Sequence, residues 1–427
     1  MPETTSAVEP AGPVSPHALL FVFITLTINA MGIGLMMPVM PALMTELTEL
    51  PVSEAARWGG AISVVYALMQ FLCGPTLGNL SDRFGRRPVL LISMFAIAID
   101  YLVMALSWHL AILFVARIIS GIAGATMSAA TAFIADISAK EDRAKNFGLV
   151  GAGFGVGFVL GPIIGGLLGE YGTRAPFYAA AALSFLNFVF GLVMLPETLK
   201  PENKRPFDWR RANPFGALKQ IAKYPAVQIL ILGLFLFDVA HYVYPAVWSY
   251  YAERVFGWSP GDIGLSLAMV GIGYALVQGV LIRYLEPRLG VSRTLLLGLG
   301  ANLVAFTGLT FATEGWMAYA LIGFAALGAL ATPAFTGLLS NLMPDNAQGE
   351  MQGLISSAAG LAMVISPFVM TQVFAVFAAP DAAVSLPGAP FALAALLILA
   401  VFAIVLPYLR RTAPAPSPSS SSENPAE

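Results

Sequence analysis

The 427 residues are 58% hydrophobic and only 11% charged, with a formal net charge of -2 and a mean hydropathy of +0.78. A water-soluble domain carries about 25% charged residues, so this composition excludes a soluble protein with an ordinary charged surface. The single cysteine excludes a disulfide framework, three scattered histidines form no local zinc motif, and no basic tract points to nucleic-acid binding.

Twelve apolar stretches, each long enough to cross a bilayer as a helix, follow one another along the chain. They are expected at residues 18–45, 56–79, 88–106, 109–134, 146–169, 174–196, 225–251, 261–284, 292–312, 316–342, 348–376 and 387–409. A long polar interval falls between the sixth and the seventh. The sequence therefore predicts an all-α membrane protein with twelve transmembrane helices, in two pseudo-symmetric six-helix bundles at 17–196 and 225–411 joined by a linker at 197–224.

Both ends of the chain are polar and rich in Pro or Ser, which predicts disordered segments at 1–16 and 412–427. Residues 1–16 lack the basic region of a signal peptide, so the first span is expected to act as the insertion signal. Lys and Arg crowd into the loops on the side of the linker, whereas the opposite loops hold only Arg57, Arg174 and Arg254. Because basic loops stay in the cytoplasm, we expect both termini there, on a multi-pass protein of the cell inner (plasma) membrane.

The loop after the second span, Gly78–Pro88 (GNLSDRFGRRP), combines small, acidic and basic residues. Its small residues permit a sharp turn, and Pro88 suits the start of the next helix. Asp82 suits a neighbouring helix N-terminus, and the arginines suit a facing carboxylate or a lipid phosphate. A basic loop that only sets the topology is the alternative. The triplet at 83–85 (RFG) recurs as 288–290 (RLG) after the eighth span, so we expect the two halves to be repeats.

The fifth span repeats glycine at close intervals, from Gly148 to Gly166. Small residues let helices approach closely in a bilayer, and Gly161-Pro162 adds a kink that buried surroundings tolerate. A packing seam between helices is the plain structural interpretation.

Arg117 lies inside the fourth span, where an arginine is costly and has to face a partner or a water-filled cavity. Asp100 lies about 18 Å up a helix that starts near Pro88, at ~1.5 Å per residue, and Arg117 lies about 12 Å from the opposite face. In a hydrocarbon core of about 30 Å the two side chains reach the same depth, so we expect them to pair. The pair is either a fixed structural ion pair or one whose separation changes during function.

Together these stretches resemble the major facilitator superfamily, and the resemblance covers nearly the whole chain. The loop at 78–88 resembles the signature loop of that family, which locks the two halves together at the cytoplasmic face in the outward-open state. The resemblance assigns a cytoplasmic gate to Gly78, Asp82, Arg83, Gly85, Arg86 and Arg87, with Asp136 as their partner.

The glycines of the fifth span resemble the antiporter signature of drug:proton exchangers in the same family. The resemblance assigns this antiporter motif to Gly148, Gly157, Gly161, Pro162, Gly165 and Gly166. Arg117 resembles the fourth-span arginine of these exporters, which implies a role in proton coupling. Asp100 and Asp238 are the candidate proton carriers, since Asp238 lies near the middle of its span with no Lys or Arg close in sequence.

The pattern is similar to the tetracycline-efflux branch, but it departs from that branch at three positions. Asn29 and Asn302 stand where the branch carries intramembrane aspartates, and Tyr274 stands where it carries a histidine. We therefore expect weak or no transport of metal–tetracycline complexes.

Polar and aromatic side chains at membrane depth are the candidates for substrate binding. They are Asn29, Gln70, Asp238, His241, Tyr242, Trp248, Tyr274, Gln278 and Asn302. Asp238 and His241 are three residues apart, so they share one helix face, and the aromatic rings nearby offer stacking surface. An interfacial aromatic belt, with His241 bonded to a neighbouring helix, is the alternative.

These features predict a secondary active transporter, a proton-coupled antiporter that exports a small amphipathic organic solute or drug by alternating access. An uptake symporter or a lipid or glycolipid flippase on the same fold is the alternative, and a membrane sensor would need a signalling domain that the sequence does not show. We expect no enzyme activity, cofactor or metal and no nucleic-acid partner. The expected partners are the solute, protons and the lipid bilayer, with the chain as a monomer.

Overall fold

A computed structural model describes residues 16–139, 142–209, 213, 225–344 and 347–412 of the chain. Within these residues, twelve helical spans are long and apolar enough to cross a membrane, and each overlaps one of the predicted stretches. The spans run at Leu19–Thr48, Val52–Phe84, Arg86–Leu106, Leu110–Ile137, Gly151–Gly169, Ala175–Met194, Val227–Phe256, Pro260–Leu289, Val291–Phe311, Gly315–Ser340, Gln348–Phe377 and Ala389–Arg411. The prediction of a twelve-span, all-α membrane protein is confirmed. The expected disordered segments at 1–16 and 412–427 lie outside the described residues, except for Pro16 and Thr412, which are helical.

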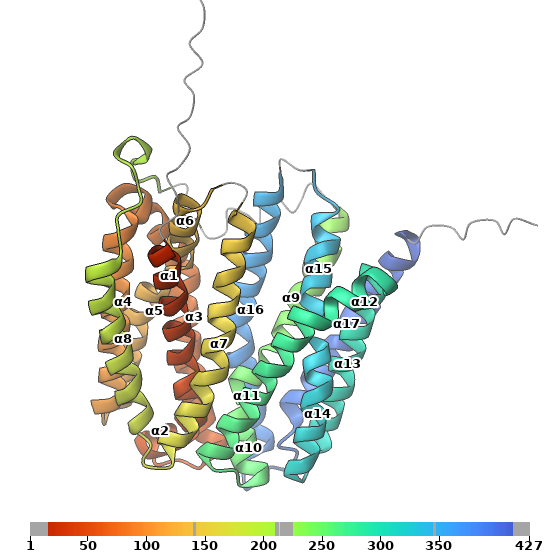
Figure 1. Ribbon diagram of the computed structural model, residues 1–427. Helices are drawn as coiled ribbons and strands as arrows, with labels where there is room; N and C mark the ends of the chain where they lie inside the picture. Colours follow the sequence, from red (N-terminus) through yellow and green to blue (C-terminus); the bar gives the residue numbers. More distant parts are fainter. Residues whose placement is uncertain (1–15, 140–141, 210–212, 214–224, 345–346, 413–427) are drawn as a thin grey trace, which may run out of the picture.

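The spans stand side by side in two groups (Figure 1). The first group consists of α1 (Pro16–Met36), η1 (Met37–Val39), α2 (Met40–Thr48), α3 (Val52–Phe84), α4 (Arg86–Leu106), α5 (Leu110–Gly124), α6 (Met127–Ile137), α7 (Arg143–Gly169) and α8 (Ala175–Met194). The second consists of α9 (Pro225–His241), α10 (Val243–Phe256), α11 (Pro260–Leu276), η4 (Val277–Leu281), α12 (Ile282–Leu289), α13 (Val291–Phe311), α14 (Gly315–Gly328), α15 (Ala331–Ser340), α16 (Gln348–Phe377) and α17 (Ala389–Thr412).

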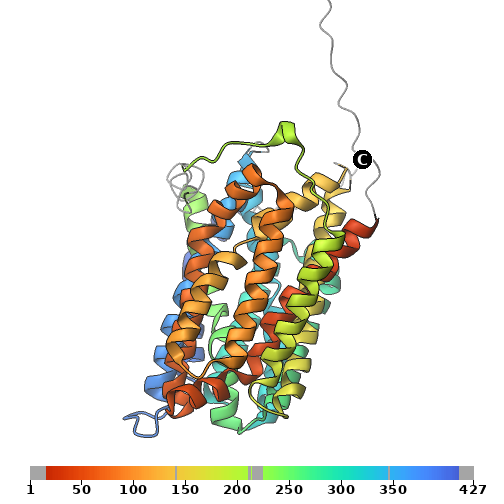
Figure 2. The ribbon, with the colours of Figure 1, turned by 90° about the vertical axis from the view of Figure 1, so that its left-hand side faces the viewer.

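The linker between the groups defines two ends of the molecule. Its described part, with a short turn at Pro201–Asn203 (η2), crosses the upper end of the first group in Figure 2. We call this the linker end and the opposite end, where α2 and α10 lie, the far end (Figure 1).

The predicted repeat is visible in the backbone of two turns at the linker end. Gly85 has φ 118° and ψ 158° between α3 and α4, and Gly290 has φ 77° and ψ 158° between α12 and α13. A positive φ is a conformation that glycine adopts without steric cost. Each glycine thus ends one helix and starts the next, at the same place in its group.

Four spans are interrupted: the fourth, seventh and tenth near their middle, and the first nearer the far end. Pro38 lies in the 3₁₀ turn between α1 and α2, and Pro245 follows the turn at Tyr242 between α9 and α10. A proline has no N–H, so the carbonyl four residues before it loses its helical partner. The eighth span is not broken but contains the π-helical turn η4, whose wider turn changes the face that later residues present.

The glycines of α7 form two packing seams rather than one. A Cβ at Gly161 would lie 2.6 Å from the Met31 carbonyl oxygen, and one at Gly165 would lie 2.7 Å from the Leu35 Cα, so both face α1. A Cβ at Gly166 would instead lie 3.2 Å from the Gly261 Cα of α11. The fifth span therefore packs against its own group and, at its far end, against the other group.

The two groups meet closely at the far end. Gly261 at the start of α11 donates its N–H to Glu170 at the end of α7, over 2.8 Å. Gly59 and Gly60 of α3 have no side chain, so Tyr250 of α10 packs directly against Gly59 and Thr371 of α16 packs directly against Gly60. Toward the linker end, α11 and α12 lean away from α7 (Figure 1). The far end is thus closed in this structure.

Candidate functional site

A cavity of about 850 Å³ lies between the two groups. Its lining extends from Met40, near the far end, to Phe21 and Leu90 in the second turns of α1 and α4, toward the linker end. Residues from both groups line it, including those at the interruptions of the first, fourth and seventh spans. The cavity thus lies on the linker-end side of the contacts that close the far end.

The cavity wall is mostly apolar and rich in methionine. Met36, Met104 and Met363 belong to three different helices that line it, together with phenylalanines such as Phe158. Methionine is flexible and polarisable, so it adapts to ligands of different shape. A wall of this kind suits a partly apolar organic molecule better than an inorganic ion.

The first group places one ion pair in this wall. An Arg117 Nη lies 2.8 Å from an Asp100 Oδ, and both side chains are only 4% exposed. The pairing expected from their depths is therefore present. Arg117 also donates to the Met104 sulfur and lies over the Tyr66 ring, with 5.4 Å between its guanidinium carbon and the ring centroid.

Neither partner of this ion pair is fully satisfied. The second carboxylate oxygen of Asp100 and the Nε of Arg117 are buried without a hydrogen-bond partner among the described residues. A buried ion pair is stable only when its remaining hydrogen-bonding groups are also satisfied. Ser120 also makes a side-chain hydrogen bond with Asp100, so the ion pair is partly satisfied, and the two free atoms can still accept or donate one hydrogen bond each.

Close packing of α5 on α3 positions the neighbouring polar groups. A Cβ at Gly121 would lie 2.7 Å from the Tyr66 carbonyl oxygen, so only glycine permits this approach. Gln70 then donates to the Tyr66 hydroxyl over 2.9 Å and to the Gly124 carbonyl over 3.3 Å. Asn29 lines the same cavity from α1.

The second group contributes an aromatic wall around the interruption of the seventh span. His241 Nε2 and the Tyr274 hydroxyl lie 2.7 Å apart, which joins α9 to α11. Tyr242 and Trp248 line the cavity beside them. The Trp248 indole N–H donates to Ser266 over 2.9 Å, so its ring is held in place.

Three of the predicted substrate-binding residues do not line the cavity. Asp238 is half-buried, one turn of α9 nearer the linker end than Tyr242, and on the same helix face. Gln278 is exposed in η4 and donates to the Ala329 carbonyl over 3.4 Å. Asn302 is 0% exposed and packs against Gly328 between α13 and α14. A substrate contact by any of the three stays a prediction.

The signature loop forms a charge network within the first group. Arg86 contacts Asp82 over 2.6 Å and Asp136 over 3.2 Å, so the expected partner of the loop is present. Gly78 permits α3 to approach Ser128 of α6, whereas Arg83 is exposed and lies over the Phe84 ring.

Sequence reasoning missed the role of Glu197 in this loop. Its carboxylate accepts the backbone N–H groups of Arg86, over 2.9 Å, and Arg87, over 3.3 Å, at the start of α4. A carboxylate at a helix N-terminus satisfies free N–H groups and complements the helix dipole. Its position at the beginning of the linker was the only signal, because 111 residues separate it from Arg86.

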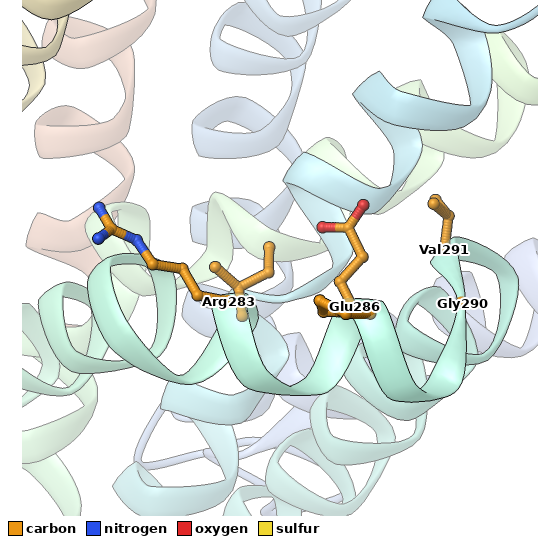
Figure 3. Close-up of a pocket in the computed structure, with 6 residues that line it drawn as sticks. Arg283, Glu286, Gly290 and Val291 are labelled. Carbon is orange, nitrogen blue, oxygen red and sulfur yellow. The ribbon is translucent and has the colours of Figure 1, made fainter.

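A second, smaller hollow of about 310 Å³ lies on α12 and the turn into α13. Arg283 and Glu286 extend from the same side of α12 without meeting (Figure 3). None of the predicted site residues lines it. No group of three or more metal-ligating side chains occurs in the part of the chain that the structure describes.

Comparison with known proteins agrees with this architecture. A family model described as Major Facilitator Superfamily matches residues 22–367 and 230–426. The chain is 41% identical over 361 residues to the class C tetracycline resistance protein of Escherichia coli, covering 84% of this chain and 90% of that protein. It is 35% identical to the class B protein of Escherichia coli, covering 81% and 86%. It is also 31% identical to a human protein named hippocampus abundant transcript 1, covering 74% and 66%.

Solved structures show the same fold at lower sequence identity. The crystal structure of the nucleoside transporter NupG has a TM-score of 0.75 at 14% identity, covering 92% of this chain and 99% of that one. A bacterial homolog of the lysosomal transporter Spinster, in an inward-facing and occupied conformation, has a TM-score of 0.74 at 15% identity, covering 92% and 96%.

Proposed function

Since the chain belongs to the Major Facilitator Superfamily and is a secondary transporter related to tetracycline resistance proteins, we propose that it is a proton-coupled antiporter that exports a small amphipathic organic solute. The observation that carries this proposal is the buried Asp100–Arg117 ion pair in the wall of the central cavity. A proton carrier has to lie where solute and proton influence the same charge, and the position of this pair in the cavity wall supports such a role.

The coupling follows from the two ways in which a buried carboxylate avoids an unpaired charge. Asp100 either pairs with Arg117 or takes a proton. A solute that draws Arg117 away from Asp100, or occupies the space between them, changes which state is favoured. The protonated and paired forms thereby stabilise different conformations of the two halves, which is the requirement for alternating access.

The distribution of basic loops supports an orientation of the chain, and the resemblance of the fifth-span glycines to an antiporter signature supports export. We infer that the linker end faces the cytoplasm, because Lys and Arg are concentrated there. The cavity then accepts solute from the cytoplasm in the present state. Opening of the far end releases that solute outside and exposes Asp100 to external protons, which return inward. Asp82, Arg86 and Asp136 are the proposed gate that closes the linker end.

The test is transport by Asp100→Asn protein reconstituted in liposomes, with the best ligand from a thermal-shift screen of drugs and metabolites. Asn keeps the size of the side chain but cannot carry a proton. We expect loss of accumulation driven by a pH gradient and retention of downhill solute exchange without a gradient. Asp238→Asn tests the competing candidate for the proton carrier. Full gradient-driven transport by Asp100→Asn, with loss in Asp238→Asn, would transfer the proton site to Asp238.

A further inference from the structure

Two polar atoms in the aromatic wall of the cavity are buried without a partner. They are His241 Nδ1 and the Tyr244 hydroxyl, and neither has a hydrogen bond among the described residues. Both residues line the cavity, and Tyr244 is only 8% exposed. Buried polar groups in proteins are nearly always hydrogen-bonded, so two such atoms in one cavity wall require an explanation.

Both side chains are packed among aromatic rings, which offer no hydrogen-bond partner to the two free atoms. His241 stacks on Phe237, with 5.5 Å between ring centroids, and its Nε2 is already used by Tyr274. Tyr244 is packed against Phe306, with 5.4 Å between centroids, and against Phe391. The His241 and Tyr244 rings meet edge to face at 5.7 Å. The two free atoms therefore belong to one rigid cluster.

The interruption of the seventh span places this cluster at the cavity. Because Pro245 has no N–H, the His241 carbonyl lacks the donor that a continuous helix would supply. The turn at Tyr242 lets α9 end on His241 and α10 begin with Val243. Discontinuous helices in transporters characteristically expose polar groups at the binding site.

We propose that His241 and Tyr244 form a polar subsite for a neutral solute group that both donates and accepts a hydrogen bond, such as a phenolic hydroxyl or an amide. This inference rests on the proposed export function. A tyrosine hydroxyl can both donate and accept a hydrogen bond. In a neutral histidine one ring nitrogen carries the proton: if Nε2 donates to Tyr274, Nδ1 accepts, and if Nε2 accepts from Tyr274, Nδ1 donates. The flat rings of Tyr242, Tyr274 and Trp248 then contact the apolar skeleton of the solute.

The charges near the cavity decide between a neutral and a cationic solute group. Among the described residues, the one arginine in the lining is Arg117, which is paired with Asp100 in the first group, whereas this cluster belongs to the second. Asp238 lies one turn away from His241 and is not part of the lining. Within the described lining, no charged side chain is therefore placed to bind an ammonium group beside the two free atoms, although an ammonium over the aromatic rings is the competing interpretation.

The experiment compares three probes with one skeleton: 1-hydroxypyrene, 1-methoxypyrene and 1-pyrenemethylammonium. Binding to the purified full-length protein is measured by energy transfer from tryptophan, for which Trp248 is 6.1 Å from Tyr244 between ring centroids. We expect 1-hydroxypyrene to bind about tenfold or more tightly than 1-methoxypyrene, because the ether cannot donate to a buried acceptor. Equal affinity of these two, tightest binding of the ammonium probe, or no saturable binding of 1-hydroxypyrene would overturn the proposal.

A matched pair of variants locates the effect. Tyr244→Phe removes only the free hydroxyl and should reduce the preference for 1-hydroxypyrene over 1-methoxypyrene by about tenfold. Tyr251→Phe lies on the same helix but removes a hydroxyl that already donates to the Leu309 carbonyl, so it should leave the preference unchanged. An unchanged preference in folded Tyr244→Phe would contradict the proposal. If that variant does not fold, the probe comparison on the native protein decides.

Binding in this assay needs no proton gradient, so its outcome is independent of the coupling proposed for Asp100. Failure of the probe comparison removes the polar subsite and leaves antiport intact. Failure of the Asp100→Asn transport test removes the coupling site and leaves the polar subsite intact.

Discussion

At the scale of single residues, the equal depth of Asp100 and Arg117 in the membrane explains their ion pair. Two helices with a rise of about 1.5 Å per residue bring the two side chains to one level, and opposite charges at that level pair because neither tolerates lipid. This contact was predictable from the sequence. The free oxygen of Asp100 was not, because it depends on which neighbouring side chains reach that oxygen in three dimensions.

Other residue assignments depended on helix rotation, which a sequence pattern specifies less well. Gln278 lies in the π-helical turn of the eighth span, and an extra residue in a turn moves the following side chains to another face. Asn302 lies in the ninth span, where its polar side chain packs within the second group and donates to the Gly298 carbonyl over 3.2 Å. The position of Gln278 and Asn302 along their spans predicted that both lie near the membrane centre, but it did not predict whether they face the cavity.

A growth assay with tetracycline tests whether the chain transports this drug with Asn29 and Asn302 at the positions where the tetracycline-efflux branch carries aspartates. A neutral amide at Asn29, in the cavity wall, binds a metal–tetracycline cation less well than a carboxylate does. We expect little or no increase in the tetracycline concentration that inhibits growth of a sensitive, pump-deleted host. The class C resistance protein is the positive control. Resistance equal to that control would show that the missing carboxylates are dispensable.

At the scale of elements, α7 connects the two halves through glycines on two of its faces. The spacing predicted a packing seam, but it did not show that Gly161 and Gly165 pack on α1 while Gly166 packs on α11. Which glycines of α7 contact α1 and which contact α11 depends on where the first span bends and where the eighth begins. Glu197 was missed for a related reason, since a cap from a distant linker leaves no local pattern.

A bulky residue at Gly166 should open the far end. In Gly166→Val a Cβ would lie 2.6 Å from the Pro260 carbonyl oxygen, so the closed state is destabilised. A cost of about 1.4 kcal/mol changes the ratio of closed to open states tenfold. A cysteine replacing Met40, in a Cys73→Ser background, should then react several-fold faster with an impermeant maleimide added from the far side.

Gly151→Val is the matched control, because it lies on the same helix outside the antiporter motif and a Cβ there meets no atom within 4 Å. It should leave the labelling rate of the cysteine unchanged. If both variants behave alike, or if Gly166→Val labels no faster than the parent, the seam between α7 and α11 does not hold the far end closed.

At the scale of the whole molecule, the order of the spans and the basic loops was accessible from the sequence. Length and hydropathy locate each span, because a bilayer admits only helices of about 20 residues at this composition. Which end of the cavity is open depends on contacts between the halves, such as the bond between Gly261 and Glu170, that involve no sequence pattern.

The topology is tested by reporter fusions at three positions. Fusions after Ser107 and Thr313 should report the periplasm, because both follow helices that end at the far end. A fusion after Arg411 should report the cytoplasm. A cytoplasmic signal after Ser107 or Thr313 would contradict the proposed order of spans across the membrane.

Proton release on solute binding tests proton-coupled antiport most directly. Purified protein in weakly buffered solution, near the pH at which solute affinity changes most steeply, is mixed with the best ligand from the thermal-shift screen, and a pH-sensitive dye follows free protons. Competition between solute and proton predicts release by the native protein, up to about one proton per solute, and none by Asp100→Asn. Proton uptake would indicate symport, and the absence of any proton change in the native protein would contradict coupling through this site.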